Sequence, residues 1–177
     1  MSQNIVVLSG SARKDRNTDI MVTAFKEGAE AAGKSVTVFR TADMTIGGCL
    51  GCSRCFADKI TCVQRDDMDQ IWEALKQADA IVFASPVYFF GVSAQLKLAV
   101  DRTYSLPNVP NTIKKAAMLL SCGDSTGNAA EGALVMHKWM LDYRQWEDGG
   151  VVLIPGVGNG IAEREELAQA RKLGEEI

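Results

Sequence analysis

Polar side chains suited to phosphate binding gather in one short stretch near the N-terminus, directly after the apolar residues 5–8. They fall within ten consecutive positions and are Ser9, Ser11, Arg13, Asn17 and Thr18. Hydroxyl and amide groups donate hydrogen bonds to phosphate oxygens, and a guanidinium neutralises phosphate charge. Unpaired N–H groups at the start of a helix favour the same negative charge. The stretch therefore predicts an anion-binding loop. The alternative is an ordinary strand-to-helix loop with Arg13 in solvent.

The stretch differs from two common nucleotide-binding motifs. It lacks the G-x-G-x-x-G pattern of dinucleotide-binding folds and the G-x-x-x-x-G-K-[ST] pattern of P-loops. Asn17 or Thr18 is expected to cap the helix whose apolar periodicity begins at Ile20.

Cysteines mark a second stretch with chemical potential, the glycine-rich segment 47–62. Their spacing is C-x2-C-x2-C-x6-C, formed by Cys49, Cys52, Cys55 and Cys62. Closely spaced thiolates can converge on one iron–sulfur cluster, and neighbouring glycines let the backbone wrap around it. The long gap before Cys62 departs from the ferredoxin run, and zinc more often uses separated pairs or histidine. A [4Fe–4S] cluster and a reduced loop without metal therefore both remain open. Cys122 stands alone elsewhere and is expected to be a packing residue.

Aromatic residues dominate a third stretch, which follows the apolar residues 80–84. Its expected ligand contacts are Pro86, Val87, Tyr88, Phe89, Phe90 and Gly91. Exposed aromatic side chains beside a phosphate site suit a flat, apolar ring system. The alternative is that the phenylalanines belong to a core or to a contact between subunits. Ser121, Gly123 and Asp124 follow another apolar run and are expected to supply polar contacts to the edge of the ring.

Strand-like and helix-like patterns alternate along the whole chain and must position these residues. The expected strands are 5–8, 35–39, 80–84, 116–120 and 151–154, and the expected helices are 20–32, 66–78, 92–104, 128–146 and 162–177. This alternation predicts an α/β fold of flavodoxin-like type. It is a doubly wound five-stranded parallel sheet of order 2-1-3-4-5, with helices on both faces. In such a sheet the three stretches after strands 1, 3 and 4 meet at one edge, where ligands bind.

Length and composition are those of a soluble globular protein. At 177 residues the chain is most simply one domain, 1–177, with the cysteine-rich loop 47–62. A net charge of -3 without a basic stripe argues against nucleic acid as a partner. No signal peptide is apparent, and the apolar runs are too short to span a membrane. We therefore expect a cytoplasmic protein without structural disulfides.

Several motifs together resemble the NAD(P)H-dependent FMN reductases. They are Ser9-Gly10-Ser11-x-Arg13-x3-Asn17-Thr18, Ser85-Pro86-Val87-Tyr88 and Lys97-x3-Asp101-Arg102. Within that group, the cysteine segment looks like that of the iron–sulfur flavoproteins. The resemblance implies that FMN binds with its phosphate on the first stretch and its ring against residues 86–91. It also implies NAD(P)H as electron donor, and a quinone, free flavin or other small molecule as acceptor.

The resemblance leaves an alternative function open, a flavin and iron–sulfur relay that takes electrons from ferredoxin. The cofactor carries the redox chemistry in either case, so no catalytic side chain is expected. His137, the only histidine, is interpreted as structural. The family resemblance also implies a homodimer or homotetramer. A stripe of aromatic and methionine side chains favours such an interface slightly over a core face, and it comprises Met136, Trp139, Met140, Tyr143 and Trp146.

Overall fold

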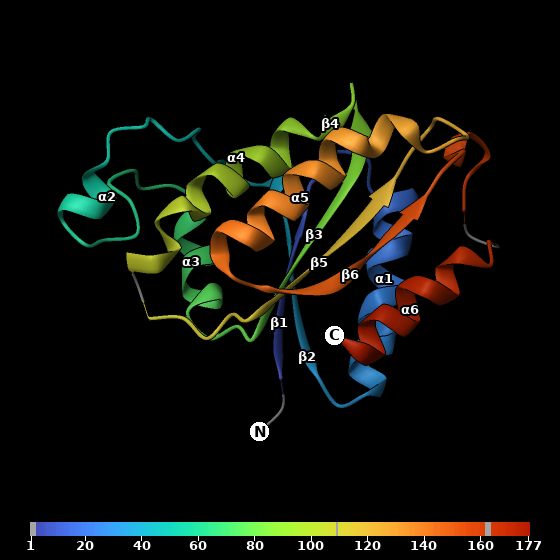
Figure 1. The fold of residues 1–177 in the computed structure, drawn as a ribbon, viewed down its shortest axis with the longest axis horizontal. Coiled ribbons are helices and arrows are strands. Elements are labelled where there is room, and N and C mark those ends of the chain that lie inside the picture. The colour runs from blue at the N-terminus through green and yellow to red at the C-terminus, as the bar shows by residue number, and fades with distance from the viewer. Residues whose placement is uncertain (1–2, 109, 162–163) are drawn as a thin grey trace.

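The structure, a computed structural model, describes residues 3–108, 110–161 and 164–177. Figure 1 shows a twisted central sheet with helices packed against it. The strands are β1 (Asn4–Ser9), β2 (Ser35–Arg40), β3 (Ala80–Tyr88), β4 (Gly91–Val92), β5 (Lys115–Ser121) and β6 (Glu147–Ile154). The α-helices are α1 (Asn17–Ala31), α2 (Arg54–Ala57), α3 (Met68–Leu75), α4 (Ala94–Arg102), α5 (Glu131–Arg144) and α6 (Glu166–Glu176). Short 3₁₀ helices are η1 (Thr41–Asp43), η2 (Thr103–Asn108), η3 (Asn128–Ala130) and η4 (Val157–Asn159).

The sheet order within the described residues is β2-β1-β3-β5-β6, and every neighbouring pair on this path is parallel. Numbered by parallel strands alone, this is the predicted order 2-1-3-4-5, so the fold prediction is confirmed. The short strand β4 was not predicted. It pairs with the end of β3 in an antiparallel hairpin.

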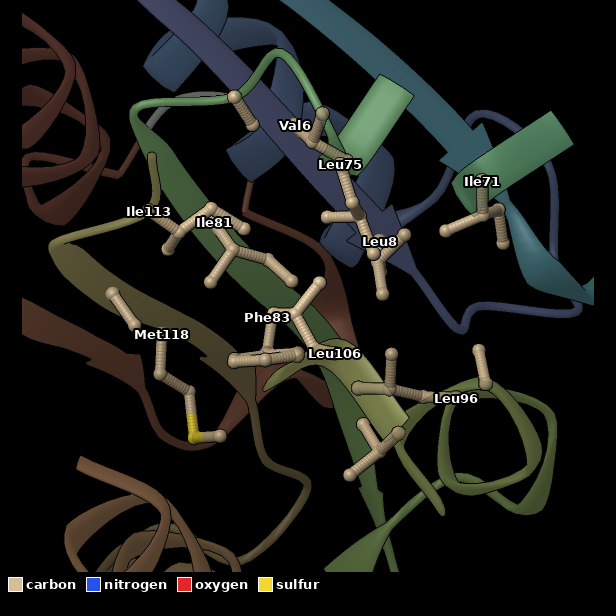
Figure 2. Close-up of a cluster of buried hydrophobic side chains, with 14 of the residues drawn as sticks. Val6, Leu8, Ile71, Leu75, Ile81, Phe83, Leu96, Leu106, Ile113 and Met118 are labelled. Carbon is tan, nitrogen blue, oxygen red and sulfur yellow. The ribbon is translucent and has the colours of Figure 1, made fainter. Parts of the chain in front are cut away.

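Each face of the sheet carries its own hydrophobic core. On one face, alternate residues of β1, β3 and β5 pack against α3, α4, α5 and η2, and Figure 2 shows this cluster, with Leu8, Phe83 and Met118 among its members. On the other face, the intervening residues, such as Val7 and Val82, pack against α1 and α6. Because both faces are covered, the central strands are apolar at each position of residues 5–8, 80–84 and 116–120, as the continuous apolar runs indicated.

Backbone contact between α1 and α6 depends on two glycines. A Cβ on Gly28 would lie 2.0 Å from the carbonyl oxygen of Arg171, and a Cβ on Gly174 would lie 2.0 Å from that of Phe25.

Gly28→Ala is therefore expected to lower the free energy of unfolding by about 2 kcal/mol, because neither backbone can move aside without opening the core. Urea unfolding measures this loss. Gly48→Ala is the matched control, because its Cβ would meet only the Leu98 side chain at 3.5 Å, and an equal loss in both variants would contradict the argument.

Several element boundaries differ from the expected ones. Asn17 and Thr18 lie inside α1 rather than capping it, because the helix begins one residue after Arg16. Residues 85–88 continue β3 instead of forming a loop, since Val87 and Tyr88 pair with β4. The last helix begins at Glu166, and the expected start at Ala162 lies outside the described residues. Trp146 follows the end of α5 and is buried in the hydrophobic core. It is therefore not part of the stripe of interface residues predicted on that helix, which corrects the prediction for this residue.

His137 is buried on α5, and neither of its ring nitrogens has a hydrogen-bond partner in the described structure. Burial lowers the pKa of His137 from 6.5, although Asp148, 3.8 Å away, partly opposes this shift. The unfolded chain therefore binds a proton more readily than the folded one. The neutral His137 side chain therefore contributes its full share of stability above pH 6.5, and this share is lost as the pH falls below 6.5. We expect the urea concentration at half-unfolding to be lower at pH 5.5 than at pH 7.5, and this difference to be smaller in His137→Met. Equal differences in the two proteins would refute this assignment.

Within the described ranges, no helix is both long enough and apolar enough to cross a membrane.

Candidate functional site

A cleft of about 560 Å³ opens at the carboxyl ends of the parallel strands, the edge at which ligands bind in sheets of this order. It is lined by Arg13, Arg16, Asn17, Pro86, Val87, Tyr88, Ser121, Gly123, Val157, Gly158 and Gly160. The segments predicted to meet here, which follow residues 5–8, 80–84 and 116–120, thus contribute to one cavity, although they are far apart in the chain. Its volume is within the range of small-molecule and cofactor sites.

The predicted phosphate-binding stretch meets the cleft at the start of α1. Arg16, the N-cap residue, makes no capping hydrogen bond with its side chain in the described structure, so the first N–H groups of the helix are not satisfied in that way. Arg13 and Arg16 supply positive charge to the cleft wall. An uncapped N-terminus of a long helix beside two guanidinium groups is an environment that favours a phosphate.

Arg40, on β2, does not line the cleft and instead anchors the loop after β1. Its guanidinium donates to the carbonyl oxygen of Ser11 at 3.2 Å and pairs with Asp19 and with Asp43. Burial alone would lower the pKa of Arg40, but the two carboxylates outweigh it and raise the pKa. Ser11 is also occupied, because its hydroxyl bonds with the backbone of Arg13.

A chain of hydrogen bonds ties the loops after β1 and β3 to each other. Ser93 Oγ donates to the Gly10 carbonyl at 2.7 Å, and Ser93 N donates to Ser85 Oγ at 2.9 Å. A Cβ on Gly10 would lie 2.3 Å from Ser93 Oγ, so only glycine fits at this position. These hydrogen bonds hold the loop after β1, the predicted anion-binding loop, beside the end of β3.

Phe89 and Phe90 lie outside the cleft lining, unlike their three predecessors. They form the two-residue turn between β3 and β4, where Tyr88 pairs with Gly91. Both have positive φ (45° and 70°), a conformation that costs a non-glycine residue about 1–2 kcal/mol. Their rings are 96% and 63% exposed and contact each other at 5.5 Å. Gly91 likewise does not line the cleft.

The loop after β5 contributes two of its three predicted residues. Ser121 and Gly123 line the cleft, and Ser121 Oγ bonds to Thr18 Oγ1 at 2.9 Å in the interior. Asp124 turns toward its own loop, where it accepts hydrogen bonds from Thr126 and the N–H of Ala129. These bonds, the Thr126 hydroxyl first, lower the pKa of Asp124. Its carboxylate is therefore already engaged.

Four cleft residues were not predicted: Arg16, Val157, Gly158 and Gly160. The last three follow β6, whose carboxyl end reaches the same edge of the sheet. Asn17 holds this segment in place, because its side-chain amide donates to the Val157 carbonyl at 3.1 Å. The glycine-rich run after the last strand was the sequence signal for this wall.

The residues present fit FMN. A buried serine hydroxyl without a hydrogen-bond partner, Ser9 Oγ, stands at the end of β1. The uncapped helix and two arginines suit a phosphate, and the backbone and side chains of residues 86–88 form a wall suited to a flat ring.

The cysteine segment projects with α2 at one end of the long axis, away from the tips of β5 and β6 (Figure 1). Cys49 and Cys52 are exposed, Cys55 and Cys62 are half-buried, and all four thiols are free. Burial raises the pKa of Cys55, and charges on Cys62, Cys49 and Cys52 raise it further, so the four thiols are electrostatic neighbours. Among the described residues, no set of three His, Cys, Asp or Glu side chains is arranged tightly enough to hold a metal ion.

An apolar groove of about 510 Å³ runs along α4 and α5 and reaches Cys49. Met136, Trp139, Met140 and Tyr143 of the predicted stripe line it, together with Val100 and Tyr104. Trp139 and Tyr143 are 64% and 63% exposed. Four of the five stripe residues therefore form one surface.

Comparison with known proteins agrees with this arrangement. The family described as NADPH-dependent FMN reductase matches residues 3–153. An iron–sulfur flavoprotein of Archaeoglobus fulgidus is 33% identical over 176 residues, which cover 97% of this chain and 77% of the relative. An iron–sulfur flavoprotein of Methanosarcina thermophila is 34% identical over 138 residues, covering 77% of this chain and 72% of the relative.

A solved structure described as NAD(P)H:quinone oxidoreductase from Methanothermobacter marburgensis has the same fold. Its TM-score is 0.79 at 20% identity, and the match covers 99% of this chain and 96% of the other. The matched family region includes the strands, the cysteine segment and all of the predicted cleft residues.

Proposed function

The chain belongs to the NADPH-dependent FMN reductase family, and from this premise we propose that it binds FMN in the cleft described above. As an oxidoreductase of this family, it would take electrons from NAD(P)H and pass them to a quinone, a flavin or another small acceptor. The observation that carries the proposal is that the loop after β1 and the carboxyl ends of β3 and β5 converge on one cavity at the start of α1.

Phosphate binding is assigned to the start of α1 and the loop before it. Arg13 and Arg16 would neutralise the phosphate, the first-turn N–H groups would donate to it, and Asn17 would hold the Val157 segment against it. Ser9, Ser11 and Thr18 would position this loop, because Thr18 bonds to Ser121 and Ser11 bonds to the Arg13 backbone.

The ring is assigned to the wall formed by Pro86, Val87 and Tyr88, with Ser121 and Gly123 at its edge. Bound FMN would supply the redox chemistry, since a flavin accepts two electrons from a nicotinamide and passes them on singly or in pairs. The chain's own residues orient the cofactor and exclude water from one side. No side-chain acid or base is assigned, and His137 stays a structural residue because it is buried and does not line the cleft.

A second candidate function rests on the cysteine segment. Cys49, Cys52, Cys55 and Cys62 would hold a [4Fe–4S] cluster, as the thiolate donor set and their mutual proximity around Cys55 suggest. Both relatives compared above are named iron–sulfur flavoproteins. With a cluster, the chain would relay single electrons between ferredoxin and the flavin instead of serving a small acceptor.

One experiment tests both candidates. Protein purified without oxygen is examined for flavin absorbance, iron and sulfide, and its flavin is then reduced with NADPH, NADH or reduced ferredoxin. Bound FMN that is reduced by a pyridine nucleotide supports the reductase. Bound iron with faster reduction by ferredoxin supports the relay. Colourless protein that does not bind FMN at micromolar concentration would overturn the proposal.

We further propose that the chain forms a homodimer or homotetramer through the α4–α5 groove, since exposed tryptophan and tyrosine on one apolar surface are typical of interfaces. Trp139→Glu is expected to reduce the mass measured by light scattering, from a dimer to one chain or from a tetramer to two chains, because a carboxylate is too costly to bury there. Gln169→Glu, at an exposed position of α6, is the control with the same added charge. An unchanged mass for Trp139→Glu would exclude this surface.

A further inference from the structure

The two ends of the cysteine segment are held together by a buried ion pair. Arg102, the last residue of α4, donates to Asp66 at 2.7 Å and to the carbonyl oxygen of Gly47 at 2.9 Å. Asp66 in turn accepts from the N–H groups of Gly47 and Met68. The Arg102 and Asp66 side chains are 1% and 12% exposed. The segment is therefore closed at its base by one guanidinium.

Two further side chains of the following 3₁₀ helix, η2, hold the middle of the segment. Ser105 Oγ donates to the carbonyl of Thr61, and Asn108 Nδ2 donates to the carbonyl of Cys55 at 2.8 Å. Residues three apart share one side of a 3₁₀ helix, so the spacing 102, 105 and 108 places the three donors on the same side. We call these three residues the cradle.

The attachment points of the cradle coincide with the cysteines. Asn108 binds the backbone of Cys55 itself, Ser105 binds the residue before Cys62, and Arg102 binds the backbone two residues before Cys49. Each donor therefore fixes the main chain at or beside a thiol.

Few other contacts hold this segment. None of the residues of α2 is buried, and Cys49 and Cys52 are exposed. A ring contact of 5.0 Å between Phe56 and Tyr104 joins it to η2. Without an apolar core of its own, the segment takes its conformation chiefly from polar anchors, and removal of an anchor should raise its mobility.

The Arg102 guanidinium also has one donor that the described structure leaves without a partner. Its Nε is buried and has no hydrogen-bond partner in the described structure, an arrangement that costs free energy unless an acceptor arrives. Burial alone would lower the pKa of Arg102, but Asp66 and the charge of Cys62 raise it above its ordinary value. Cys62 is therefore within electrostatic reach of this side chain.

We propose that Arg102, Ser105 and Asn108 are positioning residues for an iron–sulfur cluster, with the Arg102 guanidinium beside the Cys62 sulfur. The inference rests on the proposed cluster in the cysteine segment. The cradle would fix the main chain at or beside Cys49, Cys55 and Cys62, and the guanidinium would stabilise negative charge at a thiolate that holds the cluster. Outer residues of this kind orient metal ligands and tune the metal.

The test compares anaerobically purified wild type with Arg102→Lys, Arg102→Gln, Asn108→Ala and the control Arg54→Gln. Arg54 lies between Cys52 and Cys55 but is exposed and pairs only with Asp58 in the described structure, so its loss removes a loop charge without touching the cradle. The measurements are iron per bound FMN, the rate at which an iron chelator bleaches the cluster, and the reduction potential of the cluster.

Asn108→Ala and both Arg102 variants are expected to lose iron to the chelator at least about tenfold faster than wild type and Arg54→Gln, with FMN content unchanged. In Arg102→Gln the potential of the remaining cluster is expected to shift lower, because a nearby positive charge favours the reduced, more negative state. Arg102→Lys keeps the charge and should restore the potential but not the retention of iron. A purely structural role would not separate these two readouts.

The outcomes distinguish this inference from the proposed function. If wild type binds FMN but takes up no iron, the proposed cluster is wrong and the cradle inference falls with it. If wild type holds iron and all three cradle variants match Arg54→Gln in bleaching rate and potential, the cluster stands and the cradle inference alone is wrong. Unchanged FMN content shows that a variant is folded, and Asn108→Ala tests the idea without removing a buried charge.

Discussion

Arg13→Glu is expected to weaken FMN binding by about 100-fold or more while leaving riboflavin binding within about threefold. A hydrogen bond to a charged group contributes about 1.5–3 kcal/mol, and a carboxylate in its place repels the phosphate. Arg13 lines the cleft at the uncapped start of α1, where the phosphate is assigned. Riboflavin has no phosphate, so its affinity reports on the ring site alone.

Fluorescence quenching on titration of each flavin into cofactor-free protein measures both affinities. Lys14→Glu is the matched control, because it makes the same change of charge one residue away, at a side chain that pairs with Asp43 and does not line the cleft. Equal losses of FMN and riboflavin affinity in Arg13→Glu would show that Arg13 supports the loop without facing the phosphate. An unchanged FMN affinity would place the phosphate elsewhere.

Cys55→Ser is expected to remove nearly all of the iron from anaerobically purified protein while FMN stays bound. Cys55 has the other three thiols of its segment as electrostatic neighbours, and Asn108 holds its carbonyl. A serine hydroxyl is a poor substitute for the thiolate that iron–sulfur clusters require. Iron and sulfide analysis, expressed per FMN, gives the result.

The control for this change is Cys122→Ala, which also deletes one thiol but at a buried position beyond β5. It should keep the iron of wild type. Iron retained in Cys55→Ser would remove this residue from the ligand set. Equal loss of iron from both variants would mean that cysteine loss acts through the stability of the whole chain.

The fold could be predicted because its signals are local. Central strands buried on both faces must be apolar at each position, so β1, β3 and β5 appear in the sequence as continuous apolar runs. Helical periodicity and glycine separate these runs and predict a parallel sheet of the observed order. Since all parallel strands end at one edge, the meeting of Arg13, Pro86 and Ser121 followed from the order alone.

The structure places some of the predicted site residues outside the cleft lining. Phe89 and Phe90 were predicted to contact the ring from a loop, but pairing of Tyr88 with Gly91 extends the strand, and both phenylalanines are exposed and do not line the cleft. Asp124 seemed free for a ligand, yet Thr126, two residues later, takes its carboxylate in a local turn. That turn was visible in the sequence as an aspartate followed closely by a threonine.

The amino-acid sequence by itself determined the α/β architecture, the edge of the sheet where the cleft opens, and the spacing of the four cysteines, because each depends on the types of residues and on their order along the chain. Only the tertiary structure decided which side chains face the cleft, that the segment after β6 closes it, and that Arg102, Ser105 and Asn108 hold the cysteines. These outcomes depend on hydrogen bonds between segments separated by 44 or more residues, as between Ser105 and Thr61 or Asn17 and Val157. No local pattern specifies such partners, since they meet only after the helices have packed on the sheet.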